Sequence, residues 1–227
     1  MKFRYATLED CHTANGVVIL IDVLRAFSTA AYAFSRGAKE IVLVGGVEEA
    51  LALRSQNPNF KVMGEVGGLP PQGFDFGNSP THLSAEDLSG ITLIQRTGAG
   101  TQGAVRSQNA DTMLASSFVV ADATARYVRK LEVNEVTLVM TGKHGSRGDE
   151  DAACAEYLEE LLKGNCPSMQ PFIQRVFDSI DAIQHLDALQ TAFPRSDLDY
   201  CTAVDKFNFA MPVRREDGKL VMRAAKA

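Results

Sequence analysis

The chain has 227 residues, of which 45% are hydrophobic and 22% are charged, and its formal net charge is −5. This composition is that of an ordinary folded globular protein and excludes the disordered and fibrous classes. Lys and Arg form no stripe along the sequence, which argues against a nucleic-acid-binding surface, so an anionic ligand would have to be bound by a local cluster of charges.

Apolar runs and helical segments alternate along most of the chain. The run at residues 17–21 is rich in β-branched residues and predicts a strand buried on both faces, as in a parallel or mixed sheet between helices. The other predicted strands are residues 41–44, 60–63, 91–95, 112–115, 136–140, 209–213 and 220–223. The predicted helices are residues 26–36, 47–56, 101–108, 121–131, 149–163 and 167–191. This order predicts an α/β fold, a three-layer α/β/α sandwich with a mixed, mostly parallel sheet.

The organisation predicted is one domain over residues 1–227, with a small helical lobe near residues 167–203 as an option. The N-terminus has no apolar signal region, and no apolar run is long enough to span a membrane. The four cysteines have no metal-binding spacing. We therefore expect a soluble cytoplasmic protein that binds neither membrane nor nucleic acid.

In open α/β sheets, ligands bind beyond the carboxyl ends of the strands, and four polar segments follow predicted strands. In the first, Asp22 ends the strand at residues 17–21, and Arg25, Ser28 and Thr29 begin the next helix. A carboxylate there is costly unless it is paired or bound to a metal, and the arginine and hydroxyls suit a phosphate or sulfonate. The alternative is structural: Asp22 pairs with Arg25, and Ser28 caps the helix.

The second segment, residues 64–80, is long and rich in glycine and proline. It carries Glu65 and Asp75 as acids and Asn78 and Ser79 as neutral polar groups. A loop of this length in a compact domain is usually functional. A purely structural loop held by Gly and Pro turns is the alternative.

The third segment contains Thr97, Gly98, Gly100 and Thr101 and predicts a loop that cradles an anion between a strand and a helix. It lacks the lysine of a Walker A loop. With Gly103 it has the G-x-G-x-x-G spacing, but no acidic residue follows where a dinucleotide site would need one, so we discount that interpretation.

The fourth segment, residues 141–151, places Lys143, His144 and Arg147 beside Glu150 and Asp151 at the start of the helix at 149–163. Acids there could hold Mg²⁺ while the bases bind a phosphate. The alternative is a solvated cluster in which the acids favour the helix N-terminus through its dipole.

Several blocks in these segments resemble the 2-phosphosulfolactate phosphatase family. The blocks are IDVLRA at 21–26, GE at 64–65, GFDFGNSP at 73–80, TGAGT at 97–101, the segment 145–154, and DYC at 199–201 with Asp205. The resemblance implies a Mg²⁺-dependent phosphatase of α/β/α architecture, expected as a homodimer. The implied reaction is hydrolysis of 2-phospho-3-sulfolactate to 3-sulfolactate and phosphate, a step toward coenzyme M. One position departs from the family pattern, because Ala99 stands where an Asn is usual.

From the residues and the resemblance together we predict a phosphatase for a small phosphorylated, carboxylated or sulfonated substrate. Asp22, with Glu65 or Asp75 and one of Glu150 and Asp151, is expected to hold Mg²⁺. Arg25, Lys143 or Arg147 is expected to neutralise charge on the phosphoryl group. The predicted substrate-binding residues are Ser28, Thr29, Asn78, Ser79, Thr97, Gly98, Gly100 and Thr101. A phosphotransferase and a non-catalytic anion-binding protein are the alternatives.

Overall fold

A computed structural model describes residues 1–142, 148–187 and 189–227. The strands are β1 (Lys2–Thr7), β2 (Gly16–Ile21), β3 (Glu40–Leu43), β4 (Lys61–Gly64), β5 (Thr92–Arg96), β6 (Ala110–Ser116), β7 (Glu135–Met140), β8 (Phe209–Glu216), β9 (Lys219–Met222) and β10 (Ala225–Lys226). The helices are α1 (Ala26–Ser35), α2 (Val47–Gln56), α3 (Pro80–Leu83), α4 (Gly100–Arg106), α5 (Ala121–Arg129), α6 (Asp149–Leu162), α7 (Gln170–Phe177), α8 (Ile180–Ile183) and α9 (Ser196–Cys201).

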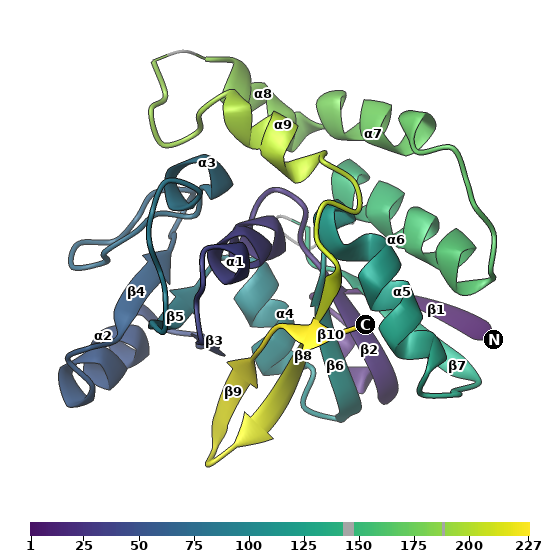
Figure 1. Ribbon diagram of the computed structural model, residues 1–227, viewed down its shortest axis with the longest axis horizontal. Coiled ribbons are helices and arrows are strands. Elements are labelled where there is room, and N and C mark those ends of the chain that lie inside the picture. Colours follow the sequence, from purple (N-terminus) through teal and green to yellow (C-terminus); the bar gives the residue numbers. More distant parts are fainter. Residues whose placement is uncertain (143–147, 188) are drawn as a thin grey trace.

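The strands form one mixed sheet in the order β1-β7-β2-β6-β8-β9-β3-β5-β4, and β10 pairs with β8. Two parallel blocks make up most of it, β1-β7-β2-β6 and β3-β5-β4. The β8–β9 hairpin runs antiparallel and lies between them, joining β6 to β3. The sequence predicted strands at residues 209–213 and 220–223, but not their place in the centre of the sheet (Figure 1).

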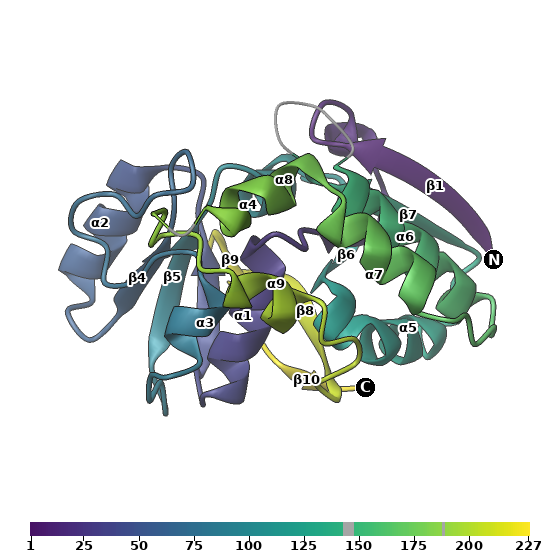
Figure 2. The same cartoon turned by 90° about the horizontal axis from the view of Figure 1, so that it is seen from above.

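Helices cover both faces of the sheet, so the three-layer prediction is confirmed. Helices α2 and α4 lie on one face, and α1, α5 and α6 lie on the other (Figure 2). Alternate residues of the apolar strands point to different layers: Val17, Ile19 and Ile21 of β2 belong to the core that α5 and α6 cover. This two-sided burial is why β2 reads as a continuous apolar run.

Helices α7, α8 and α9 and the described segments between them, residues 170–187 and 189–201, lie across one end of the sheet near α3 and α6 (Figure 1). We call this segment the helical cap. It corresponds to the helical lobe that the sequence allowed near residues 167–203. In the part of the chain that the structure describes, no helix has both the length and the apolar character needed to cross a membrane.

Candidate functional site

A pocket of about 210 Å³ lies where the carboxyl ends of the strands meet the helical cap. All four strand-end segments contribute to its wall. The contributing residues are Asp22, Leu24 and Arg25 after β2; Glu65, Gly67, Gly68 and Asn78 after β4; Gly98 and Ala99 after β5; Gly142, Glu150 and Asp151 after β7; and Asp181, Gln184 and Phe193 from the cap. The strand-end rule therefore brings these distant segments to one place.

Asp22 is buried at the end of β2, and its side chain is held in place by its neighbours. Its Oδ1 accepts the backbone N–H of Ala26 at 2.8 Å, and its Oδ2 accepts the hydroxyl of Thr141 at 3.3 Å. Burial raises the pKa of Asp22 to about 6, opposed by the hydrogen bond from Ala26 and aided by the nearby charge of Glu65. Burial and a neighbouring acid both disfavour the ionised form of a carboxylate, so binding of a cation would stabilise it.

Glu150 is the second buried carboxylate of the pocket and opens helix α6. Burial raises its pKa to about 7, and the charges of Asp181 and Asp22 act in the same direction. No side-chain or backbone donor from another described residue is seen to hold its carboxylate. Within the described residues, its own backbone N–H is the donor that lowers its pKa.

Asp151 and Glu65 line the same pocket, but backbone N–H groups already occupy both oxygens of each. Asp151 accepts from Val23 at 2.8 Å and from Gly142 at 3.0 Å, so it ties the end of β2 to the end of β7. Glu65 accepts from Gly68 at 2.7 Å and from the backbone N–H of Gly98. These contacts favour a structural role that shapes the pocket.

The carboxylates present fit Mg²⁺ better than a metal that needs several protein ligands. Within the described ranges, no group of three or more His, Cys, Asp or Glu side chains is arranged to hold a metal ion. Mg²⁺ commonly takes one or two carboxylates and completes its shell with water and substrate oxygens. Asp22 and Glu150 supply such a pair, and the charge of Asp22 contributes to the raised pKa of Glu150.

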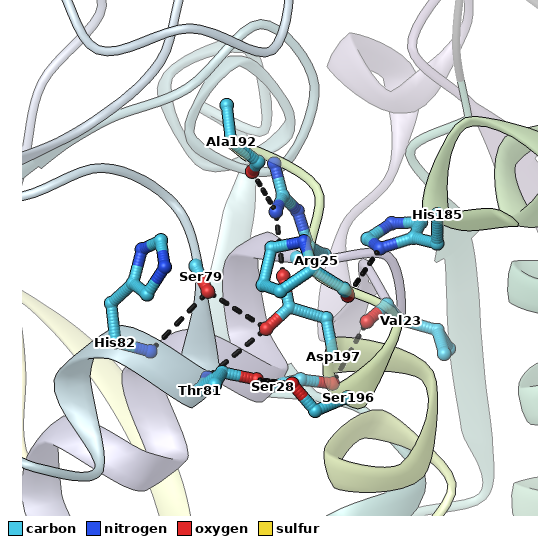
Figure 3. A network of polar contacts seen from close by, with 11 residues as sticks. Val23, Arg25, Ser28, Ser79, Thr81, His82, His185, Ala192, Ser196 and Asp197 are labelled. Carbon is cyan, nitrogen blue, oxygen red and sulfur yellow. Dashed lines mark hydrogen bonds and ion pairs between the residues drawn. The ribbon is translucent and has the colours of Figure 1, made fainter. Parts of the chain in front are cut away.

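Arg25 is directed away from Asp22, so the structural alternative of an Asp22–Arg25 pair does not occur. Its Nη1 donates to Asp197 at 2.6 Å and to the carbonyl of Ala192 at 2.7 Å, and both partners belong to the cap. The ring of Phe193 lies 4.5 Å from the guanidinium carbon. Figure 3 shows Arg25 between these cap residues and Asp197 as the centre of the network.

Several predicted ligand residues lie in the shell around the pocket rather than on its wall. Ser28 donates to the carbonyl of Val23 at 2.8 Å, so it is not the helix cap that the alternative proposed. The hydroxyl of Thr29 is buried and has no hydrogen-bond partner within the described residues. Ser79 donates to Asp197 at 2.7 Å.

Thr97 and Thr101 hold each other at the start of α4 instead of facing the pocket. The backbone N–H of Thr97 donates to Oγ1 of Thr101 at 2.9 Å, and the N–H of Thr101 donates to Oγ1 of Thr97 at 3.0 Å. They fix the loop whose residues Gly98 and Ala99 reach the wall.

Asp75 lies outside the pocket, at the other end of β4. Its carboxylate accepts the backbone N–H of Val62 at 2.8 Å and pairs with Lys61 at 3.2 Å and Arg54 at 3.4 Å. We therefore remove Asp75 from the expected metal ligands. Lys143, His144 and Arg147 lie outside the residues that the structure describes.

The residues that the cap contributes to the site and its support, Asp181, Gln184, Phe193 and Asp197, were not predicted. They come from the cap, which follows no strand, so the strand-end rule could not find them. The DYC block lies next to Asp197 in the sequence, but only the fold brings that carboxylate to Arg25.

Gly100 must lack a side chain for Asp22 to sit where it does. A Cβ at Gly100 would lie 2.7 Å from Cβ of Ala26 and 2.8 Å from Oδ2 of Asp22. We expect Gly100→Ala to displace the carboxylate and to lower kcat/KM by about a hundredfold, since small misplacements at a reaction centre have effects of that size. Gly45→Ala is the control, because the nearest atoms there are 3.8 Å away. Equal activity of both variants in a phosphate-release assay would contradict the role of this contact.

The chain is similar in sequence to several known proteins over most of its length. Residues 4–216 match the family model described as 2-phosphosulpholactate phosphatase. The chain is 37% identical over 203 residues to a probable 2-phosphosulfolactate phosphatase of Bacillus subtilis, covering 89% of this chain and 88% of that protein. A protein of the same description from Thermus thermophilus is 31% identical over 230 residues, covering 95% of each chain. A third, from Deinococcus radiodurans, is 36% identical over 163 residues, covering 71% of this chain and 68% of that one.

Proposed function

This chain belongs to the 2-phosphosulpholactate phosphatase family, and we propose that its pocket hydrolyses a small phosphorylated hydroxy acid with the help of Mg²⁺. The first substrate to test is 2-phospho-3-sulfolactate, with 3-sulfolactate and phosphate as products. The observation that carries the proposal is the pair of buried carboxylates, Asp22 and Glu150, at the meeting point of the strand ends. The expected homodimer, the cytoplasmic location and the link to coenzyme M stay predictions.

The described part of the pocket is acidic, so it would repel a substrate that carries several negative charges. Five carboxyl groups, those of Asp22, Glu65, Glu150, Asp151 and Asp181, line it beside Arg25. A substrate with several negative charges needs added positive charge here, and Asp22 and Glu150 would hold the Mg²⁺ that supplies it. When bound, the ion would neutralise phosphoryl oxygens as a Lewis acid.

The chain's own groups would orient the substrate and the attacking water. Asn78 lines the pocket, and its buried Oδ1 has no hydrogen-bond donor within the described residues, so it can accept from a water molecule or a substrate hydroxyl. Phe193 adds an apolar ring to the wall of the pocket. Direct attack by water is favoured over a phospho-enzyme, because Leu24 stands where a haloacid-dehalogenase-like site would need a second aspartate.

The test of the function is phosphate release by the purified protein from a panel of small phosphorylated hydroxy acids, with Mg²⁺ and with a chelator. We expect release with 2-phospho-3-sulfolactate that depends on Mg²⁺. Transfer of phosphate to an acceptor without release would favour the phosphotransferase alternative. Binding of the substrate without any turnover would favour the non-catalytic alternative.

Metal binding should also be visible in the stability of the protein. The folded-state pKa values of Asp22 and Glu150, about 6 and about 7, lie above the ordinary values of 3.8 and 4.5. At a pH between the ordinary and the folded-state pKa of each group, the folded protein therefore binds more protons than the unfolded protein. The free energy of unfolding consequently falls as the pH rises from about 4 to about 7. Without metal we expect a loss of up to about 3 kcal/mol per group across this window, read as a falling melting temperature.

Mg²⁺ is expected to reverse this loss, because it compensates the ionised carboxylates. The rise in melting temperature on adding Mg²⁺ should be larger near pH 8 than near pH 5. The double variant Asp22→Asn/Glu150→Gln serves as the control and should lose the Mg²⁺-dependent rise. A rise that persists in the double variant would place the metal elsewhere.

A further inference from the structure

Arg25 lines the pocket, and among the described residues the hydrogen bonds of its guanidinium are made by Nη1. A guanidinium has five N–H donors, and the two on Nη1 meet Asp197 and the carbonyl of Ala192. Within the described ranges no acceptor meets Nε or Nη2. These two nitrogens form the fork that binds two oxygens of a carboxylate or sulfonate side by side.

The position of this fork is fixed by Asp197, whose side chain is completely buried. Oδ1 of Asp197 accepts from the hydroxyl of Ser79 at 2.7 Å and from the backbone N–H of Thr81 at 3.0 Å, while Oδ2 accepts from Arg25 at 2.6 Å. Three donors from two segments of the chain, residues 79–81 and Arg25, thus hold one carboxylate (Figure 3). A guanidinium anchored in this way loses little conformational freedom when it binds an anion.

The residue that anchors Arg25 and the carboxylates of the pocket come from different parts of the fold. Asp22, Glu65 and Glu150 are supplied by the ends of strands or by the helix after β7, whereas the anchor of Arg25 belongs to the cap. Among the described residues, Asp197 is the one ion-pair partner of Arg25, so the pocket carboxylates leave its outward edge unused. Two anionic groups of one substrate can therefore be bound at two places.

We propose that Arg25, positioned by Asp197, is a specificity-determining residue that binds the acid group of the substrate that is not transferred. Arg25 would pair its Nε–H and Nη2–H with two oxygens of a carboxylate or sulfonate, while the phosphoryl group lies beside Asp22 and Glu150. Asp197 acts through Arg25 and does not touch the substrate. This inference rests on the proposed phosphatase function and names the substrate class: phosphomonoesters that carry a second anion.

A matched pair of substrates tests the role of Arg25. 2-Phospholactate and isopropyl phosphate share a skeleton, but a methyl group replaces the carboxylate in the second. We expect the wild-type protein to favour 2-phospholactate by about a hundredfold in kcat/KM, as a site built to pair a polar group rejects the analogue without it. Arg25→Met should remove this preference, so that kcat/KM falls much more on 2-phospholactate than on isopropyl phosphate.

An equal loss on both substrates would overturn the proposal, because it would place Arg25 on the phosphoryl group. Arg25→Met leaves Asp197 buried without its partner, so the double variant Arg25→Met/Asp197→Asn is measured beside it. Loss of the preference in the double variant, with a melting temperature near that of the wild type, supports the proposal. A preference retained by the folded double variant overturns it.

The positioning role of Asp197 is tested by kinetics and by chemical rescue. Asp197→Asn should raise KM for 2-phospholactate by about tenfold with little change in kcat, and should leave isopropyl phosphate nearly unaffected. In Arg25→Ala, added guanidinium ion should restore hydrolysis of 2-phospholactate, because Asp197 can hold it. Rescue of equal size in Arg25→Ala/Asp197→Asn would overturn the positioning role.

A binding measurement can show whether the inference about Arg25 or the proposed phosphatase function has failed. Calorimetry with 3-sulfolactate requires no turnover, and we expect binding to the wild type that is lost in Arg25→Met. If the wild type hydrolyses no phosphoester but shows this difference in binding, the inference stands and the function fails. If it hydrolyses both substrates of the pair equally, the function stands and the inference fails. Absence of both acid preference and 3-sulfolactate binding overturns the inference.

Discussion

Asp22→Asn is expected to lower kcat/KM on the order of a thousandfold while raising the melting temperature of the protein without added Mg²⁺. The activity falls because the amide removes the negative charge that holds the cation against the phosphoryl group, and losses of this size follow removal of one electrostatic contact in other sites. The stability rises because burial and Glu65 disfavour the ionised carboxylate of Asp22. Phosphate release and thermal unfolding, measured on the same preparation, check both parts.

Asp75→Asn is the matched control, because both acids follow strands in the sequence and only Asp22 lines the pocket. Asp75 pairs with Lys61 and Arg54 on a partly exposed surface, where such pairs contribute about 1 kcal/mol or less. We expect its rate to stay within about twofold of the wild type. A loss in Asp75→Asn as large as that in Asp22→Asn would contradict the assignment of the two acids. A lower melting temperature in Asp22→Asn would contradict the idea that burying the ionised carboxylate of Asp22 destabilises the folded protein.

The largest expected effect on stability is that of Asp151→Ala, which removes about 4 kcal/mol from the free energy of unfolding. Two buried backbone N–H groups, those of Val23 and Gly142, lose their acceptors, and each costs about 1 to 3 kcal/mol if unsatisfied. Burial raises the pKa of Asp151 well above its usual range, so part of this loss is offset by removing a poorly solvated group. Denaturant unfolding at fixed Mg²⁺ concentration measures the difference.

Asp149→Ala controls for the loss of an acid in the first turn of α6. Asp149 is exposed, and its favourable interaction with the helix dipole is about 0.3 to 1 kcal/mol. An Asp151→Ala variant with wild-type stability that no longer responds to Mg²⁺ would mean that Asp151 is a metal ligand and not the tie between β2 and β7.

The sheet and the meeting of the strand-end segments could be predicted because they depend on local signals. Continuous apolar runs mark strands buried on both faces, and parallel strands present their carboxyl ends at one edge. Strand β1 was missed because most of its residues are not buried, so it has no such run. The end of β2, in contrast, could be predicted as part of the site, because a single carboxylate follows five apolar residues.

The errors in the predicted site have physical causes that lie beyond local sequence. The loop after β4 turns back along its own strand, since the N–H groups of Asp75 and Phe76 both donate to the carbonyl of Val62. Asp75 is thereby carried away from the carboxyl edge. Arg25 is paired with Asp197, 172 positions along the chain, rather than with Asp22 nearby. Contacts of that separation are fixed by how the cap folds over the sheet.

The central hairpin has a consequence for how the protein is made. The two parallel blocks of the sheet meet only through β8 and β9, and the last of these ends at Met222. During synthesis on the ribosome, the inner edges of β6 and β3 therefore stay unpaired until β8 and β9, which end at Met222, have emerged. Asp22 follows a strand of one block, and Glu65 follows a strand of the other. A nascent chain halted before residue 209 would hold every pocket residue yet lack the strands that set the spacing between them.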